Sequence, residues 1–207
     1  MHLPARWRTV VSATTAALAA AALTAAPAAA DTGGPSPGGC PDIPTVQPFT
    51  PWGDVADYLL APDGDLEAGA SAWLLEDGAS AVEGNDPLPV GAATDRQMLR
   101  LPAGATATTA PMCIGVEHRT MRFLGTSPKS GTLLVEVLYS KRNGEQKSIT
   151  LGAVRGTGEW APSPVLPMRV NEQAGDDNAM SVSLRFSARG TAAWDIDDVY
   201  VDPYRMK

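Results

Sequence analysis

The sequence predicts an all-β protein built as a sandwich or a barrel, and three observations lead to this prediction. Short stretches of alternating apolar and polar residues recur from about Thr45 onward. Turn-forming stretches such as PAGA, TSPKSG and AGDDNA separate them. No part of the chain after residue 30 keeps a helical period over three turns. Roughly eight to ten short strands in one domain are typical of a sandwich or a barrel.

The first thirty residues have the pattern of a secretory signal peptide. Arg6 and Arg8 precede an apolar stretch from Val10 to Ala26, and small residues lead to Ala30. A basic start, an apolar middle and an A-x-A cleavage site direct export, so residues 1–30 are predicted to be removed and the protein to be secreted. The alternative is an uncleaved alanine-rich helix. No later stretch approaches the ~20 apolar residues that span a bilayer, so we expect no membrane anchor.

The charge of the mature chain excludes two classes of partner. Loss of the signal leaves 14 basic and 23 acidic residues, a net charge of −9. A chain so acidic is not expected to bind nucleic acid or an anionic membrane. The 177 residues that remain correspond to one ordinary domain, which we expect to be a monomer.

A short arm precedes this domain. Residues 31–44 begin with the Gly/Pro-rich sequence DTGGPSPGG, which cannot bury apolar surface and predicts a flexible arm. The β-domain is predicted to span residues 45–207. Cys40 and Cys113 are the two cysteines of the chain, and export favours a disulfide between them over two free thiols.

The predicted strands follow one another along the domain. The clearest is Met180–Ser187, where alternate residues are apolar and the others polar. Thr132–Ser140 leads through Asn143-Gly144, a strong hairpin signal, into Ser148–Val154. The other candidates are Val55–Leu60, Ala72–Leu75, Gln97–Leu101, Thr120–Leu124 and Val165–Val170.

The closing strand, Trp194–Pro203, carries four aspartates and changes phase in its middle. Trp194 and Ile196 share one face, whereas Val199 and Val201 have the opposite parity. This change predicts a β-bulge at Asp197-Asp198, with both carboxylates turned toward a sheet edge.

Two motifs resemble those of galactose-binding-like jelly rolls, especially the carbohydrate-binding modules of bacterial glycoside hydrolases. The first is DGDLEAG, residues 63–69, followed by Trp73, with Leu66 where the family usually has Phe. The second is the closing Ile196-Asp197-Asp198-Val199. The resemblance implies a jelly-roll sandwich and leaves the arm from Cys40 to about Pro62 outside the module. The chain also resembles a group of secreted proteins from high-GC Gram-positive bacteria.

The same resemblance implies a structural calcium ion. First and last strands lie side by side in such jelly rolls, so Asp65 and Glu67 would approach Asp197 and Asp198. Calcium accepts hard oxygen ligands in irregular geometry, which suits such a site. The alternative is that these acids are solvated edge residues that prevent pairing with another chain. Asp195 and Asp202 are expected to face solvent.

The sequence identifies no catalytic residue. His118 is the one histidine left after signal removal, which excludes a histidine-rich zinc site, and no G-x-S-x-G is present. The acidic residues that could form a glycosidase pair are too many to single out a pair: Glu76, Asp77, Glu83, Asp86 and Glu136. We therefore expect no enzymatic activity.

Aromatic side chains are the candidates for sugar binding, because their faces stack on pyranose rings. The resemblance implies that Trp73 and Trp160 are buried, and Trp194 is in phase with Ile196. This leaves Trp52, Tyr58 and Tyr139 as predicted platforms. The predicted function is that of a secreted, non-catalytic module that binds extracellular or cell-wall glycan. The alternative is a protein-interaction or structural jelly-roll domain without sugar affinity.

Overall fold

The structure is a computed structural model that describes residues 40–41, 43–115, 118–141, 143–168, 170 and 179–203. The chain divides into Met1–Thr32 and Gly33–Lys207, and the described residues all belong to the second unit. The predicted signal peptide and most of the predicted arm lie outside the described residues. No helix in the described part of the chain is long and apolar enough to cross a membrane.

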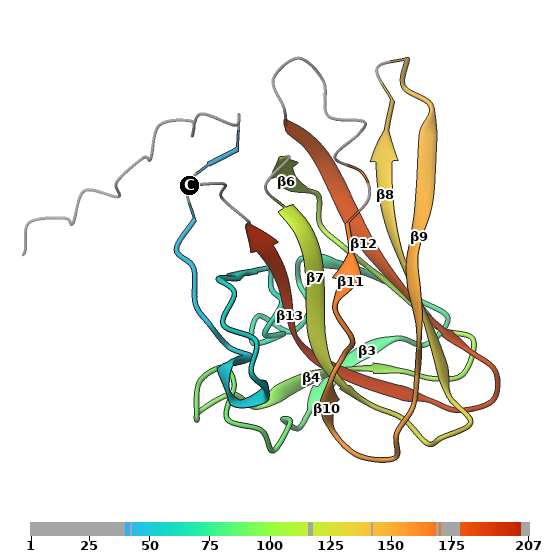
Figure 1. The fold of residues 1–207 in the computed structure, drawn as a ribbon. Helices are drawn as coiled ribbons and strands as arrows, with labels where there is room; N and C mark the ends of the chain where they lie inside the picture. Colours follow the sequence, from blue (N-terminus) through green and yellow to red (C-terminus); the bar gives the residue numbers. More distant parts are fainter. Residues whose placement is uncertain are drawn as a thin grey trace, which may run out of the picture. The chain divides into compact units, whose positions relative to one another are not determined.

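The described fold is all-β, as predicted (Figure 1). One short 3₁₀ helix, η1, covers Thr50–Trp52. The strands are β1 (Leu59–Leu60), β2 (Trp73–Glu76), β3 (Ser80–Glu83), β4 (Gln97–Leu101), β5 (Thr106–Thr109), β6 (Met112–Gly115), β7 (His118–Thr126), β8 (Thr132–Ser140), β9 (Gln146–Arg155), β10 (Ala161–Pro162), β11 (Leu166–Pro167), β12 (Ala179–Arg189) and β13 (Trp194–Pro203).

The strands form two antiparallel sheets that pack as a sandwich, which confirms the predicted jelly-roll sandwich. The seven-stranded sheet has the order β10-β7-β13-β4-β3, with β1 beside β13 and β11 beside β7. The six-stranded sheet has the order β2-β5-β12-β8-β9, with β6 also beside β12. The hairpin predicted at Asn143-Gly144 joins β8 to β9.

Two apolar clusters lie on opposite faces of the seven-stranded sheet. The main core lies between the sheets and includes Phe123 and Val201. Their neighbours in sequence, Leu124 of β7 and Tyr200 of β13, point away from the main core. They belong to a second cluster with Phe49 and Tyr58. The side chains of a strand alternate between its faces, so β7 and β13 contribute to both clusters. Residues 43–60, here called the strap, thus cover part of the outer face of this sheet.

The bulge predicted in the closing strand is present. The pairing of β13 with β7 shifts register between Asp197 and Tyr200, and Asp198 has a φ of 51°. The added residue lets Ile196 and Val199 both face the main core, where each is fully buried. The predicted position at a sheet edge is wrong, because β13 lies between β7 and β4. Figure 1 shows β7 and β13 side by side in the middle of the sheet.

Candidate functional site

The two motifs that carry the family resemblance meet in the structure. Val199 donates its backbone N–H to the carbonyl of Gly64 at 2.9 Å, and Ala61 donates to the carbonyl of Val199 at 2.9 Å. A Cβ atom on Gly64 would lie 2.6 Å from the Val199 oxygen, so this approach requires glycine. The indole N–H of Trp73 donates to the Asp63 carbonyl at 2.9 Å. The opening motif is therefore a tight turn packed against the bulge of β13.

A group of carboxylates lies around this bulge. Asp197 and Asp198 are each 2% exposed and Asp86 is 5% exposed. Asp197 Oδ2, Asp198 Oδ1 and Asp86 Oδ2 are buried without a hydrogen-bond partner in the described structure. The charges of Asp86, Asp95 and Asp65 all act on Asp198. We call these five aspartates, Asp65, Asp86, Asp95, Asp197 and Asp198, the acidic cluster.

Burial and mutual repulsion change the titration of the acidic cluster. Burial, followed by the charge of Asp198, raises the pKa of Asp197 to about 8. Burial, followed by the charge of Asp86, raises the pKa of Asp198 to about 7. Burial also raises the pKa values of Asp65 and Asp86. Among the described residues, no basic side chain forms an ion pair with Asp86, Asp197 or Asp198, which is an unusual arrangement for charged groups in a protein interior.

The structure brings together part of the predicted metal-binding set. Asp65, Asp197 and Asp198 belong to the acidic cluster, whereas sequence reasoning missed Asp86 and Asp95 as members. Glu67 Oε1 accepts the backbone N–H groups of Arg96 and Gln97, each at 2.7 Å. Among the described residues, no three His, Cys, Asp or Glu side chains are grouped closely enough to hold a metal ion by themselves.

The two aspartates assigned to solvent have partners instead. Asp195 accepts two hydrogen bonds from the Arg100 guanidinium, at 2.8 and 2.9 Å. Asp202 accepts a hydrogen bond from the Thr120 hydroxyl at 3.0 Å. Both pairs join adjacent strands across the outer face of the sheet, which corrects the expectation of simple solvent exposure.

Burial also corrects the predicted aromatic platforms. Tyr58 is 1% exposed and its hydroxyl donates to Asp54 at 2.8 Å. Tyr139 is 7% exposed and points into the main core. Neither ring can offer a face to a sugar. Trp52 is 39% exposed and remains a predicted platform. The side chain of His118 lies outside the described residues.

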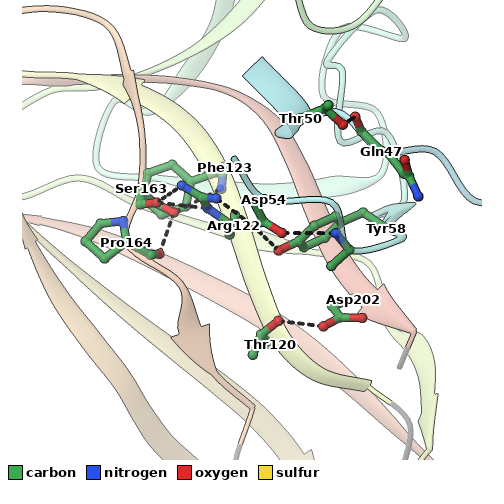
Figure 2. A network of polar contacts seen from close by, with 11 residues as sticks. Gln47, Thr50, Asp54, Tyr58, Thr120, Arg122, Phe123, Ser163, Pro164 and Asp202 are labelled. Carbon is green, nitrogen blue, oxygen red and sulfur yellow. Dashed lines mark hydrogen bonds and ion pairs between the residues drawn. The ribbon is translucent and has the colours of Figure 1, made fainter. Parts of the chain in front are cut away.

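The strap is held by a disulfide just before its first residue and by an ion pair within it. Cys40 forms the predicted disulfide with Cys113 of β6, with the two Cα atoms 5.5 Å apart. The disulfide is consistent with folding in an oxidising compartment. Farther along, Arg122 of β7 contacts Asp54 Oδ2 at 2.6 Å and donates two hydrogen bonds to the Ser163 carbonyl. Figure 2 shows Arg122 between Asp54 of the strap and Ser163, which lies in the loop between β10 and β11.

The outer face of the six-stranded sheet carries a row of side chains that crosses five strands. Strand register aligns Leu74, Thr108, Arg185, Glu136 and Thr150 in turn. Arg185 donates two hydrogen bonds to Glu136 Oε2, at 2.8 and 3.1 Å. Leu74 and Thr150 at the two ends of the row are exposed, and the Arg185 side chain is 32% exposed. We call this set the polar row.

The polar row spans four inter-strand steps, or ~19 Å, and solvent reaches its two ends and Arg185, whereas Glu136 is 8% exposed. The neighbouring rows add further hydroxyl groups, among them Thr106, Ser183 and Ser148. These groups include hydrogen-bond donors and acceptors with one fixed ion pair at the centre. Such a surface can bind an extended polar ligand laid across the strands.

Solved structures with a similar course of the chain include several carbohydrate-binding modules. The CBM22-1 xylan-binding domain of Paenibacillus barcinonensis Xyn10C matches with a TM-score of 0.47 and 14% identity, over 73% of this chain and 97% of that one. TmCBM61, solved with β-1,4-galactotriose, matches with a TM-score of 0.42 and 15% identity, over 68% of this chain and 95% of that one.

A third match is the CBM22-1–GH10 part of Clostridium thermocellum xylanase 10B, solved with xylohexaose. Its TM-score is 0.47 and its identity 13%, over 68% of this chain and 28% of that one, so this chain spans under a third of the xylanase structure. Models of protein families and curated proteins give no match. Likeness of this degree concerns the path of the backbone and does not establish what this protein binds.

Proposed function

We propose that this chain is a secreted, non-catalytic module that binds an extracellular or cell-wall glycan on the outer face of its six-stranded sheet. The observation that carries the proposal is the polar row, because it places a fixed ion pair and two threonine hydroxyls in line across five strands. The motif resemblance to carbohydrate-binding modules supports the same class of ligand.

The chemistry of the polar row suits a neutral sugar chain better than a charged one. Glu136 and Arg185 offset each other's charge, while the hydroxyl groups beside them can both donate and accept hydrogen bonds. A sugar hydroxyl can donate to a carboxylate and accept from a guanidinium, and hydrogen bonds to charged groups are the stronger ones. Leu74 at the end of the row offers apolar surface to a ring.

A glycan array followed by titration of the polysaccharide that binds tests this proposal. We expect Glu136→Gln to weaken binding roughly tenfold, because one hydrogen bond to a charged group is lost or weakened. Glu159→Gln, in an exposed loop, is the matched control and should bind as the unmodified protein does. If Trp52→Ala abolishes binding and Glu136→Gln does not, the glycan binds at the strap and the polar row is not its site.

A protein-interaction domain is the second candidate. It is favoured by four apolar side chains on the strap that remain exposed: Ile43, Val46, Trp52 and Val55. The absence of any signal on the array, together with binding of a protein partner, would favour this alternative over the glycan-binding module.

We also propose that the bulge of β13 binds a structural calcium ion. Asp198 would be its central ligand, with Asp65, Asp197 and Glu67 from the predicted set and with backbone carbonyls. The unpartnered buried oxygens of Asp197 and Asp198 support this assignment, since a cation would satisfy both. Calcium takes six to eight oxygens and accepts carbonyls, so it does not need three closely grouped carboxylates. Bound there, the ion would join the opening turn to the last strand and offset the repulsion between the aspartates.

Calcium is expected to raise the melting temperature, and more strongly at pH 8.5 than at pH 5. At a hundredfold excess over its dissociation constant, a ligand of the folded state stabilises it by ~2.7 kcal/mol. For a domain of this size that corresponds to about 5–10 °C. The folded-state pKa values of about 8 and 7 lie above the ordinary value of 3.8. In the calcium-free protein, the contribution of these two aspartates to stability is therefore fully present below about pH 4, falls as pH rises, and is lost once pH has passed the folded-state pKa values of about 7 and 8.

Thermal melts in calcium and in EDTA at the two pH values measure this effect. Asp198→Asn should remove most of the response, and asparagine tolerates the positive φ at this position. Asp77→Asn, in the exposed turn after β2, should keep the response unchanged. Equal melting temperatures in calcium and in EDTA at pH 8.5 would exclude the ion.

A further inference from the structure

The charges of the chain are divided unequally along the sequence. From Cys40 to Asp95 the chain contains eleven acidic residues and no Lys, Arg or His. From Arg96 to Lys207 it contains fourteen basic and eleven acidic residues. The strap and the loop that leads into β4 both belong to the first segment, so any surface made by these two alone is without basic side chains.

A pocket of about 380 Å³ opens between the strap and this loop. Val46, Pro48 and Pro51 line it on the strap side, and Pro89 and Val90 on the loop side. Val46 is 51% exposed. Its backbone is fixed by two hydrogen bonds to Tyr58, at 2.8 and 2.7 Å, so the side chain is presented from a rigid strap. The strap side of the pocket is therefore preformed, and the prolines and valines supply the apolar part of its wall.

The pocket is surrounded by negative charge. Gly91 lines it, and a Cβ atom on Gly91 would lie 2.6 Å from Asp95 Oδ2 and 3.1 Å from Asp198 Oδ2. Of these two carboxylates, Asp95 is partly exposed and carries the negative charge of this part of the wall, whereas Asp198 is 2% exposed and belongs to the proposed calcium site. On the strap side, Gln47 lines the pocket and donates to the exposed Asp57 at 3.1 Å. The surroundings therefore favour a positively charged ligand.

The two polar side chains of the lining, Gln47 and Tyr200, each already have a hydrogen-bond partner, which argues against a sugar in this pocket. The Gln47 amide donates to Asp57, and the Tyr200 hydroxyl donates to Asp198. A pyranose ring would bring several hydroxyls to walls of proline and valine and lose hydrogen bonds to water. An aliphatic side chain or a proline loses none on entering the same walls.

We propose that this pocket is a docking site for a basic segment of another polypeptide, which inserts an apolar side chain between the prolines while its lysines or arginines face Asp57 and Asp95. The volume accommodates one or two side chains, so the contact is that of a short linear segment. Trp52, which follows Pro51 and is 39% exposed, extends the apolar surface beside the opening. This interaction surface is independent of the polar row, which lies on the other sheet.

Fluorescence anisotropy with labelled heptapeptides tests the site on the full secreted chain. The probe places Leu-Pro-Leu between two lysines on each side. One control peptide replaces the lysines by glutamates, and another replaces Leu-Pro-Leu by Gly-Ser-Gly. We expect only the first peptide to bind, with an affinity that falls as sodium chloride is raised, because charges steer and hold the complex.

Val46→Lys should weaken binding of this peptide by roughly tenfold or more, because it places a cation in the wall of the pocket. Val165→Lys is the matched control: Val165 is 50% exposed, lies outside the pocket, and its replacement should leave the affinity unchanged. Equal melting temperatures of the two variants exclude a folding defect. Glu136→Gln should bind the peptide normally, which separates this site from glycan binding.

Three results would overturn the inference. Equal binding of the lysine and glutamate peptides would exclude charge recognition. If the peptide with Gly-Ser-Gly binds as tightly as the peptide with Leu-Pro-Leu, the apolar pocket is not the binding site. Equal weakening by Val46→Lys and Val165→Lys would show a general charge effect instead of a local site.

Discussion

Arg122→Ala is expected to lower the free energy of unfolding by about 3–5 kcal/mol, the cost of removing one partner from a buried ion pair. The Arg122 side chain is 11% exposed, and its guanidinium carbon lies 4.5 Å from the centre of the Phe49 ring. Removal leaves the Ser163 carbonyl without its two donors and Asp54 without its ion-pair partner, while the Tyr58 hydroxyl and the Ala56 N–H still donate to Asp54. It also leaves a cavity between the strap and β7. Urea unfolding at neutral pH measures the change.

The partly buried charge of Asp54, whose side chain is 18% exposed, is the main reason for so large a cost. Burial acts to raise the pKa of Asp54, but hydrogen bonds from Arg122 and Tyr58 lower it below its usual value. Without Arg122, one of the hydrogen bonds that offset the effect of burial on the Asp54 pKa is lost. Asp54→Asn should therefore recover part of the stability lost in Arg122→Ala, since the group left without its ion-pair partner is then neutral. Arg100→Ala is the control, because its pair with Asp195 is much more exposed and should cost under ~1 kcal/mol. Similar losses in the two arginine variants would contradict this account.

The alternation of apolar and polar residues was enough to predict the strands that are long and amphipathic. Gln97–Leu101 agrees with β4, and the predicted Met180–Ser187 lies within β12. The bulge was predictable for the same reason, because only an added residue allows Ile196 and Val199 to face one core. The position of β13 inside the sheet was not predictable, since it depends on which strands pair across long sequence distances.

Strands that are short and made of small residues have too weak an alternation of apolar and polar side chains to be predicted from the sequence. β5 has the sequence TATT, in which Ala107 and Thr109 face the core without an apolar alternation. β3 (Ser80–Glu83) likewise lacks a strong apolar residue at every second position. Such segments become strands because their neighbours supply the hydrogen bonds and the core, which is a tertiary effect.

The candidate sites were only partly predictable from the sequence. The motif resemblance correctly brought the opening turn to the last strand. It could not show that Asp86 and Asp95 join the acidic cluster, because both come from a loop without a recognisable pattern. Tyr58 was predicted to be exposed because the strap was not expected to carry a second apolar cluster. The polar row could not be predicted from the sequence, since its five members come from five different strands.

Loss of the disulfide is the other change with a large expected effect. Cys40 and Cys113 are 73 positions apart, and closing a loop of this length in the unfolded chain stabilises the fold by ~4 to 5 kcal/mol in the chain-entropy account. The Cys40→Ser, Cys113→Ser double variant should lose a stability of this size and melt at least several degrees lower. The free energy of unfolding of this variant should also fall more steeply with denaturant concentration, because an unfolded chain without the cross-link exposes more surface.

Adding Arg122→Ala to this double variant shows where the disulfide acts. If the bond acts through the unfolded chain, the two losses of free energy should add, because Arg122 acts in the folded state alone. If the bond mainly holds the strap on the folded protein, Arg122→Ala should cost much less once the cysteines are replaced, since the strap would already be loose. A loss of under ~1 kcal/mol in the cysteine variant itself, measured by urea unfolding, would show that the Arg122 contacts and the second apolar cluster hold the strap without the bond.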